Sequence, residues 1–343
     1  SYGDALFEAA NGGNEAEVIR LLQYGPPLEW TKWQITPLLG AVIYGHKAIV
    51  QALIAAGADA DPKSNYYMNT PLFEAAKNGH DTIAEMLIAA GANVNRKGNG
   101  SRRPLDAAIQ RRHRSIVKLL IAAGANVQHE GYEGNTMLVQ AIATGDDAIV
   151  QMLIAAGANV AFDQRYARTP LNTAWEKTPL VAAAKNGFEA IVRMLIAAGA
   201  DVNRPSYHAE RPLYAAASSG HDAIVKQLID AGADIDHECA DGNTPLVSAA
   251  THGHGTIVDQ LIAAGASVNR KGSHGDAALN KAAENGRDAV VVQLIAAGAD
   301  IRIEGKVRLD DANLQIKAQM RNSFETHHST SALKKAEKQS STS

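Results

Sequence analysis

Apolar residues in this chain recur with helical spacing in short segments that end at glycine. In one such segment Ile83, Met86, Leu87 and Ala90 fall at positions i, i+3, i+4 and i+7, which is the stripe of an amphipathic helix. Gly91 follows directly, and glycine suits a helix end because it adopts the left-handed conformation without a Cβ clash. The pattern therefore predicts an amphipathic helix that ends at this glycine.

The same segment returns along most of the chain. Its closing glycines are Gly57, Gly91, Gly124, Gly157, Gly199, Gly232, Gly265 and Gly298. The intervals between neighbours are 34, 33, 33, 42, 33, 33 and 33 residues, so a unit of 33 residues recurs and is interrupted once by 9 extra residues. Such a period is typical of repeat architectures, in which neighbouring units stack to bury a shared core.

A second signal with the same period marks the start of several units. Thr-Pro-Leu occurs at residues 36–38, 70–72, 178–180 and 244–246. Threonine caps a helix start and proline suits the first helical turn. Paired alanines follow these segments and are small enough for the first helices of neighbouring units to lie close together. Each unit is therefore predicted to be a helix, a tight turn, a second helix and an extended, hairpin-like connection.

The phrases at residues 70–80 and 90–95 resemble the ankyrin repeat. The resemblance runs from about Asp4 to about Ile301 and covers nine copies. It implies an all-α solenoid of stacked helix-turn-helix units with β-hairpin-like fingers, in a family that mostly binds other proteins. The expected domains are the repeat array at 1–302 with a finger insertion at 162–175, a capping helix at 303–324, and a polar, disordered tail at 325–343. The tail's Ser, Thr and Lys content also resembles the export signals of bacterial effectors.

Aromatic and basic residues gather in the predicted fingers and at the ends of first helices, where the ankyrin family's recognition surface usually lies. Aromatic residues and arginine are enriched in interface hot spots. We therefore predict a protein or peptide partner held on the concave, finger-bearing surface by Trp33, Tyr44, Tyr66, Tyr67, Arg102, Arg111, Tyr132, Tyr166, Trp175 and Tyr207. The insertion is the strongest single pointer, because insertions on one face of a repeat array often mark its binding face. The alternative for Trp30 and Trp33 is core packing under their loop. The alternative for the insertion is a tolerated surface loop whose aromatic residues pack on their own hairpin.

The segment from Arg96 to Lys118 is strongly basic, with eight lysines and arginines against one acid, Asp106. It offers a second hypothesis, in which the patch at 96–114 binds an anionic ligand or nucleic acid. The alternative to binding either ligand is a basic face that is simply exposed to solvent. Arg112 also stands where other copies have a turn glycine, so that turn is expected to be strained or differently shaped.

Composition narrows the function classes. A net charge of −3 and a pI of about 6.5 create no overall attraction to nucleic acid or to an anionic membrane. No apolar run is long enough to span a membrane, and the single cysteine, Cys239, fits a reducing compartment. We expect a cytoplasmic protein, located in the host cytoplasm if it is a secreted effector, and monomeric alone. The sequence carries no phosphate-binding glycine loop, His-Glu-x-x-His motif, nucleophile elbow or paired zinc cysteines, so we expect no enzyme activity, no cofactor and no metal.

Overall fold

The computed structural model describes residues 1–62, 69–129, 131, 136–161, 178–206, 209–272 and 276–300. These residues contain α-helices and one short 3-10 helix, and no strand. The helices are α1 (Tyr2–Asn11), α2 (Glu15–Leu22), α3 (Pro37–Ile43), α4 (Lys47–Ala55), α5 (Pro71–Asn78), α6 (Asp81–Ala89), η1 (Asn99–Ser101), α7 (Pro104–Gln110), α8 (Arg114–Ala122), α9 (Met137–Thr144), α10 (Asp147–Ala155), α11 (Pro179–Asn186), α12 (Glu189–Ala197), α13 (Pro212–Ser219), α14 (Asp222–Asp230), α15 (Pro245–His252), α16 (Gly255–Ala263), α17 (Ala278–Glu284) and α18 (Asp288–Ala296). The predicted capping helix and tail lie outside the described residues.

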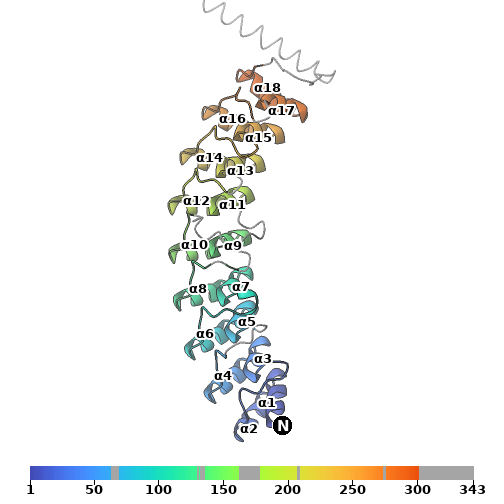
Figure 1. Ribbon diagram of the computed structural model, residues 1–343, viewed down its shortest axis with the longest axis vertical. Coiled ribbons are helices and arrows are strands. Elements are labelled where there is room, and N and C mark those ends of the chain that lie inside the picture. The colour runs from blue at the N-terminus through green and yellow to red at the C-terminus, as the bar shows by residue number, and fades with distance from the viewer. Residues whose placement is uncertain are drawn as a thin grey trace, which may run out of the picture. The chain divides into compact units, whose positions relative to one another are not determined.

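The chain divides into two compact units. The first comprises Ser1–Ala183 with Ala190–Ala200, and the second comprises Ala184–Glu189 with the residues from Asp201 onward. In the first unit α1, α3, α5, α7 and α9 contact one another in succession, and so do α2, α4, α6, α8 and α10. In the second unit α13, α15 and α17 form one such row and α14, α16 and α18 the other. Within each unit Figure 1 shows these rows as two columns, which confirms the predicted all-α solenoid of helix-turn-helix units.

The predicted helix signals act as expected. The threonine hydroxyls of Thr36, Thr70, Thr178 and Thr244 accept hydrogen bonds from the backbone N–H groups of Leu39 (3.1 Å), Phe73 (3.1 Å), Val181 (3.3 Å) and Val247 (3.3 Å). The closing glycine of the segment first recognised, Gly91, has a φ of 93°. Threonine caps and left-handed glycines therefore set the start of the first helix and the end of the second.

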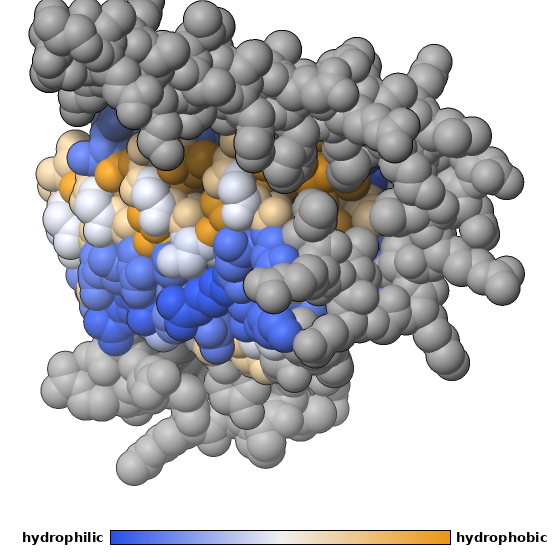
Figure 2. Space-filling model, turned by 90° about the horizontal axis from the view of Figure 1, so that it is seen from above, coloured by the Kyte–Doolittle hydropathy of each residue, from blue (hydrophilic) through white to orange (hydrophobic). Residues whose placement is uncertain are grey.

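The apolar stripes form the core between the two columns. Ile83 and Leu87 of α6 are buried, as are the paired alanines Ala75 and Ala76 of α5. Full burial of an isoleucine or leucine side chain contributes roughly 1.5–3 kcal/mol. Viewed from above, the hydrophobic residues gather in a band beside a hydrophilic one (Figure 2), as expected for helix pairs that are apolar on one side only.

The predicted fingers are tight, hairpin-like loops. In the described parts of four fingers a backbone N–H donates to the carbonyl four residues later: Gly98 to Arg102 (2.7 Å), Ser206 to Glu210 (2.8 Å), Cys239 to Asn243 (3.0 Å) and Gly272 to Asp276 (3.0 Å). The finger before α3 is closed instead by an antiparallel bridge between Lys32 and Ile35. The hairpin-like geometry therefore forms without strands in the part of the chain that the structure describes.

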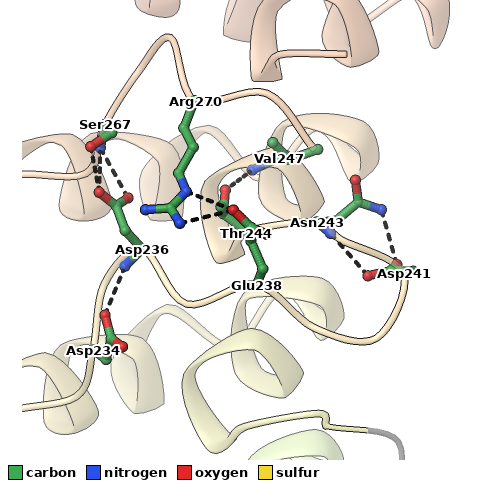
Figure 3. Close-up of polar contacts among 9 residues, drawn as sticks. All are labelled: Asp234, Asp236, Glu238, Asp241, Asn243, Thr244, Val247, Ser267 and Arg270. Carbon is green, nitrogen blue, oxygen red and sulfur yellow. Dashed lines mark hydrogen bonds and ion pairs between the residues drawn. The ribbon is translucent and has the colours of Figure 1, made fainter. Parts of the chain in front are cut away.

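Polar side chains link each finger to the next. The amide of Asn95 donates to the carbonyl of Gly124 (3.0 Å) and accepts from the N–H of Asn126 (2.7 Å). Asn203 and Asn269 bridge in the same way to residues 29 and 31 positions later. Asp236 occupies the equivalent place, and Figure 3 shows it accepting from Ser267. Successive repeats are thus held in register by a ladder of side-chain to backbone hydrogen bonds.

Replacing Asn95 by alanine should lower the free energy of unfolding by about 1–2 kcal/mol, because a carbonyl and an N–H both lose their partner. Replacing it by aspartate should have about half that effect, since a carboxylate accepts but does not donate, as Asp236 does naturally. Urea unfolding followed by circular dichroism measures both. Equal losses for the two variants would show that the donated bond contributes nothing.

A second ladder runs along the tight turns. The rings of His46, His80, His113, His221 and His254 each place Nε2 3.2–3.4 Å from a backbone carbonyl of the preceding repeat. Each ring also lies against that repeat's left-handed turn glycine, where an added Cβ would be 2.7–2.8 Å from the ring. These turn glycines therefore leave room for a neighbouring histidine.

The turn at Arg112 is strained, as the sequence predicts. Its φ is 59°, so the turn keeps the left-handed shape with a residue that rarely adopts it. The next repeat has Asp146 in place of the usual histidine, so no ring presses against this turn. Arg112 instead donates from its guanidinium to the carbonyl of Thr144.

Candidate functional site

The finger that precedes α3 has an unusual tip. Lys32 and Ile35 exchange two backbone hydrogen bonds of 3.1 and 3.0 Å, and the two residues between them, Trp33 and Gln34, have φ values of 52° and 68°. Positive φ at both central positions is the requirement of a type I′ turn, which strongly favours asparagine and glycine. A residue with a Cβ costs roughly 1–2 kcal/mol in this conformation, so the tip stores backbone strain.

This strained tip holds Trp33 in solvent. The residue is 75% exposed, although its ring forms a T-shaped pair with Phe7, with the ring centres 6.2 Å apart. The ammonium of Lys32 lies 4.7 Å from the centre of the indole and also pairs with Glu8. Phe7 and Lys32 were not singled out in the sequence, because nothing in their spacing relates α1 to the next finger. They fix the orientation of an indole that is open to solvent.

The two tryptophans of this connection have different roles. Trp30 packs against α1, where a Cβ on Gly3 would lie 2.6 Å from its ring. Trp30 therefore packs on α1 with one side while 38% of the residue stays exposed, whereas Trp33 is 75% exposed.

Tyr44 caps the opposite end of α3. It is 60% exposed, and its ring stacks on His46 with the ring centres 6.1 Å apart. Since α3, α5 and α7 bury all but their C-terminal ends, the positions that this column offers to a partner are finger tips and helix ends. Trp33 and Tyr44 occupy one of each.

Arg102 and Arg111 flank α7, with Arg111 at the same helix end as Tyr44 and Arg102 at the base of the finger, directly before the helix cap Arg103. Arg102 lies in the finger before the helix, with its guanidinium 5.6 Å from the centre of the Phe73 ring. Arg111 caps the C-terminal end of α7 and is exposed. We use the name finger face for the surface marked by Trp33, Tyr44, Arg102 and Arg111. Its finger row is Trp33 and Arg102, and its turn row is Tyr44 and Arg111.

The other basic residues of this segment are used between repeats. Arg96 pairs with Asp61 at 2.6 Å and Arg114 with Asp146 at 2.8 Å. Burial acts to raise the pKa of Asp146, but hydrogen bonds from Arg114 and from the N–H of Ile149 outweigh it, and the pKa lies below its usual range. A continuous basic patch over 96–114 is therefore reduced to fewer available charges than the sequence indicates.

Six of the predicted binding residues cannot be placed. Tyr66, Tyr67, Tyr132, Tyr166, Trp175 and Tyr207, together with the insertion at 162–175, lie outside the described residues. For them the expectation of a partner-binding role stays a prediction.

The described ranges contain no cluster of three or more histidine, cysteine or acidic residues that could hold a metal. Cys239 is a buried thiol whose pKa is raised to about 12, chiefly by burial, so this side chain is held protonated. In the same ranges no helix is both long and apolar enough to cross a membrane.

Comparison with known proteins is consistent across sequence and structure. The profile of a family described as ankyrin repeats (3 copies) matches residues 6–98, 96–164, 163–239 and 213–304. Among solved structures, the human ASB11 ankyrin repeat domain is similar, with 28% sequence identity and a TM-score of 0.58. That match covers 70% of this chain and 100% of the other. No curated protein matches the chain.

Proposed function

Because this chain belongs to the ankyrin repeat family, we propose that it is a non-catalytic scaffold that binds a protein or peptide through the finger face. Members of the family generally act as protein-interaction scaffolds, which supports the general class. The proposal includes a cytoplasmic location, in keeping with the unpaired thiol of Cys239.

The observation that carries the proposal is the exposure of Trp33 on a strained turn. Left-handed residues other than glycine persist only where the surrounding structure imposes them, and they concentrate at functional sites. An indole that is 75% exposed gives the isolated chain little burial energy in return for that strain. A partner that buries the ring would gain this burial energy on binding, since buried tryptophans are enriched among interface hot spots.

The test replaces the strained tip by the turn that the backbone prefers. Trp33→Asn combined with Gln34→Gly should raise the free energy of unfolding by about 1 kcal/mol, because both positions accept the new residues in a type I′ turn. The same variant should weaken peptide binding by at least about 30-fold, the equivalent of 2 kcal/mol lost at a tryptophan hot spot. Binding is measured on peptides selected with the wild-type chain from a random display library.

Gln34→Gly alone is the matched control. It should raise stability by a similar amount and leave peptide binding unchanged, because the indole remains. Peptides that bind the double variant as tightly as the wild type would exclude Trp33 as the anchor.

A further inference from the structure

The finger face changes from aromatic residues at α3 to arginines at α7. In the finger row, aromatic Trp33 before α3 is followed by cationic Arg102 before α7. In the turn row, aromatic Tyr44 at the end of α3 is followed by cationic Arg111 at the end of α7. The two rows lie at opposite ends of the same helices. In each row an aromatic residue at α3 is followed by an arginine at α7.

The positive charge at α7 is not neutralised from within the described chain. Neither Arg102 nor Arg111 forms an ion pair there, and Arg102 instead faces the ring of Phe73. The acid of α5, the preceding helix of the same column, already has partners. Glu74 of α5 binds Lys77 at 3.3 Å and Asn69 at 2.6 Å.

Asp106 of α7 is likewise occupied and is withdrawn from the surface. Its carboxylate is 2.9 Å from the ring of His129, and both side chains are buried. The two arginines are therefore left to an external anion, and a guanidinium binds a carboxylate through two parallel hydrogen bonds.

We propose that the finger face between α3 and α7 binds an extended acidic peptide segment, with apolar side chains against Trp33 and Tyr44 and carboxylates against Arg102 and Arg111. The assignment rests on the proposed function and specifies its partner. The apolar anchor fits the aromatic pair, and the carboxylates fit the unpaired arginines.

The geometry sets the spacing within that segment. Helices α3, α5 and α7 contact in succession, and packed helices lie about 8–10 Å apart. Two such steps are roughly 20 Å, which an extended chain covers in about six residues at 3.3 Å each. The anchor and the acidic residues should therefore be about five or six positions apart, in either chain direction.

A peptide is favoured over nucleic acid by the number of available cations. Binding to a nucleic-acid backbone requires several lysines and arginines that neutralise successive phosphates. Here Arg96 and Arg114 are neutralised by acids of neighbouring repeats, and the aromatic end of the finger face carries Lys32 paired with Glu8.

The experiment is a random peptide display selection on the full-length chain and on Arg102→Glu combined with Arg111→Glu. The wild type should enrich aspartate and glutamate about five or six residues from an aromatic or aliphatic residue. The charge-reversed variant should enrich lysine and arginine at that spacing, and should bind the wild-type peptides at least about 10-fold more weakly. Arg102→Gln with Arg111→Gln gives an intermediate loss.

Lys47→Glu combined with Lys118→Glu is the control. It makes the same change in net charge, but on exposed positions of α4 and α8, and it should leave the selected peptides unaffected. Circular dichroism establishes that each variant is folded.

Other outcomes separate this inference from the proposed function. If the selection yields apolar peptides without acidic residues, and their binding is lost when Trp33 is replaced, the proposed scaffold function holds and the acidic partner is wrong. Peptides indifferent to both Trp33 and the two arginines would overturn both. A fluorescein-labelled, random-sequence single-stranded RNA that binds the wild type and not the arginine variant, in a chain that selects no acidic peptide, would assign the arginines to nucleic acid.

Discussion

Replacing Asp106 by alanine is expected to lower the free energy of unfolding by about 2–4 kcal/mol, because a buried and a part-buried donor would each lose a hydrogen-bond acceptor. Its carboxylate accepts from the N–H of Arg103 at 2.7 Å and lies 2.9 Å from Nε2 of His129. The other ring nitrogen of His129 is 2.6 Å from the carbonyl of Asn126. Both ring nitrogens thus face acceptors, and removing Asp106 strands a buried donor.

The apolar double variant separates the pair from the packing around it. In other repeats the position of Asp106 is taken by buried apolar residues, namely Phe73, Val139, Val181 and Val247. Asp106→Val combined with His129→Leu should therefore recover at least half of the loss caused by Asp106→Val alone, since buried pairs are often replaceable by hydrophobic residues. Urea unfolding compares the wild type, Asp106→Val and the double variant. A double variant no more stable than the single one would show that the pair is not the source of the loss.

The helix pairs could be predicted almost completely from the sequence. Periodic apolar residues, Thr-Pro starts and glycine ends are local signals, and each depends on the conformation of a few consecutive residues. The fingers were predictable as hairpin-like connections for the same reason. The ladders between repeats were not, because Asn95 meets partners 29 and 31 residues away that become neighbours only when the repeats stack.

The finger face was predictable in part. The exposure of Trp33 and Tyr44 follows from their place at a finger tip and a helix end, which the repeat frame determines. The strain at Trp33 and Gln34 has no sequence signature, since neither residue is one that a type I′ turn prefers. Counting charges in the basic segment could not show that Asp61 and Asp146 of neighbouring repeats pair with Arg96 and Arg114.

Arg112 shows where a correct local rule was incomplete. The sequence indicated a position that requires a left-handed backbone, and the φ of 59° agrees. The second constraint on this position, a histidine ring from the next repeat, appears only in the stacked structure. Where Asp146 replaces that histidine, the second constraint is absent and arginine occurs.

The same two constraints predict unequal effects for two equivalent glycines. Gly45→Ala should lower the free energy of unfolding by about 2–5 kcal/mol, combining roughly 1–2 kcal/mol for a left-handed alanine with about 1–3 kcal/mol of overpacking. Its Cβ would lie 2.7 Å from Cε1 of His80, so the ring must move and lose its contact with the carbonyl of Ile43, 3.4 Å away.

Gly286→Ala is the matched control, because this turn has a φ of 66° and no described atom within 4 Å of an added Cβ. It should lose only the conformational part, roughly 1–2 kcal/mol. Adding His80→Ala to Gly45→Ala tests the cause, since the second change should then cost less than it does in the wild type, and the coupling in this double-mutant cycle measures the clash. If both glycine variants lose the same stability in urea unfolding, the histidine rings do not constrain the turns. The missing ring would then not explain why arginine replaces glycine at position 112.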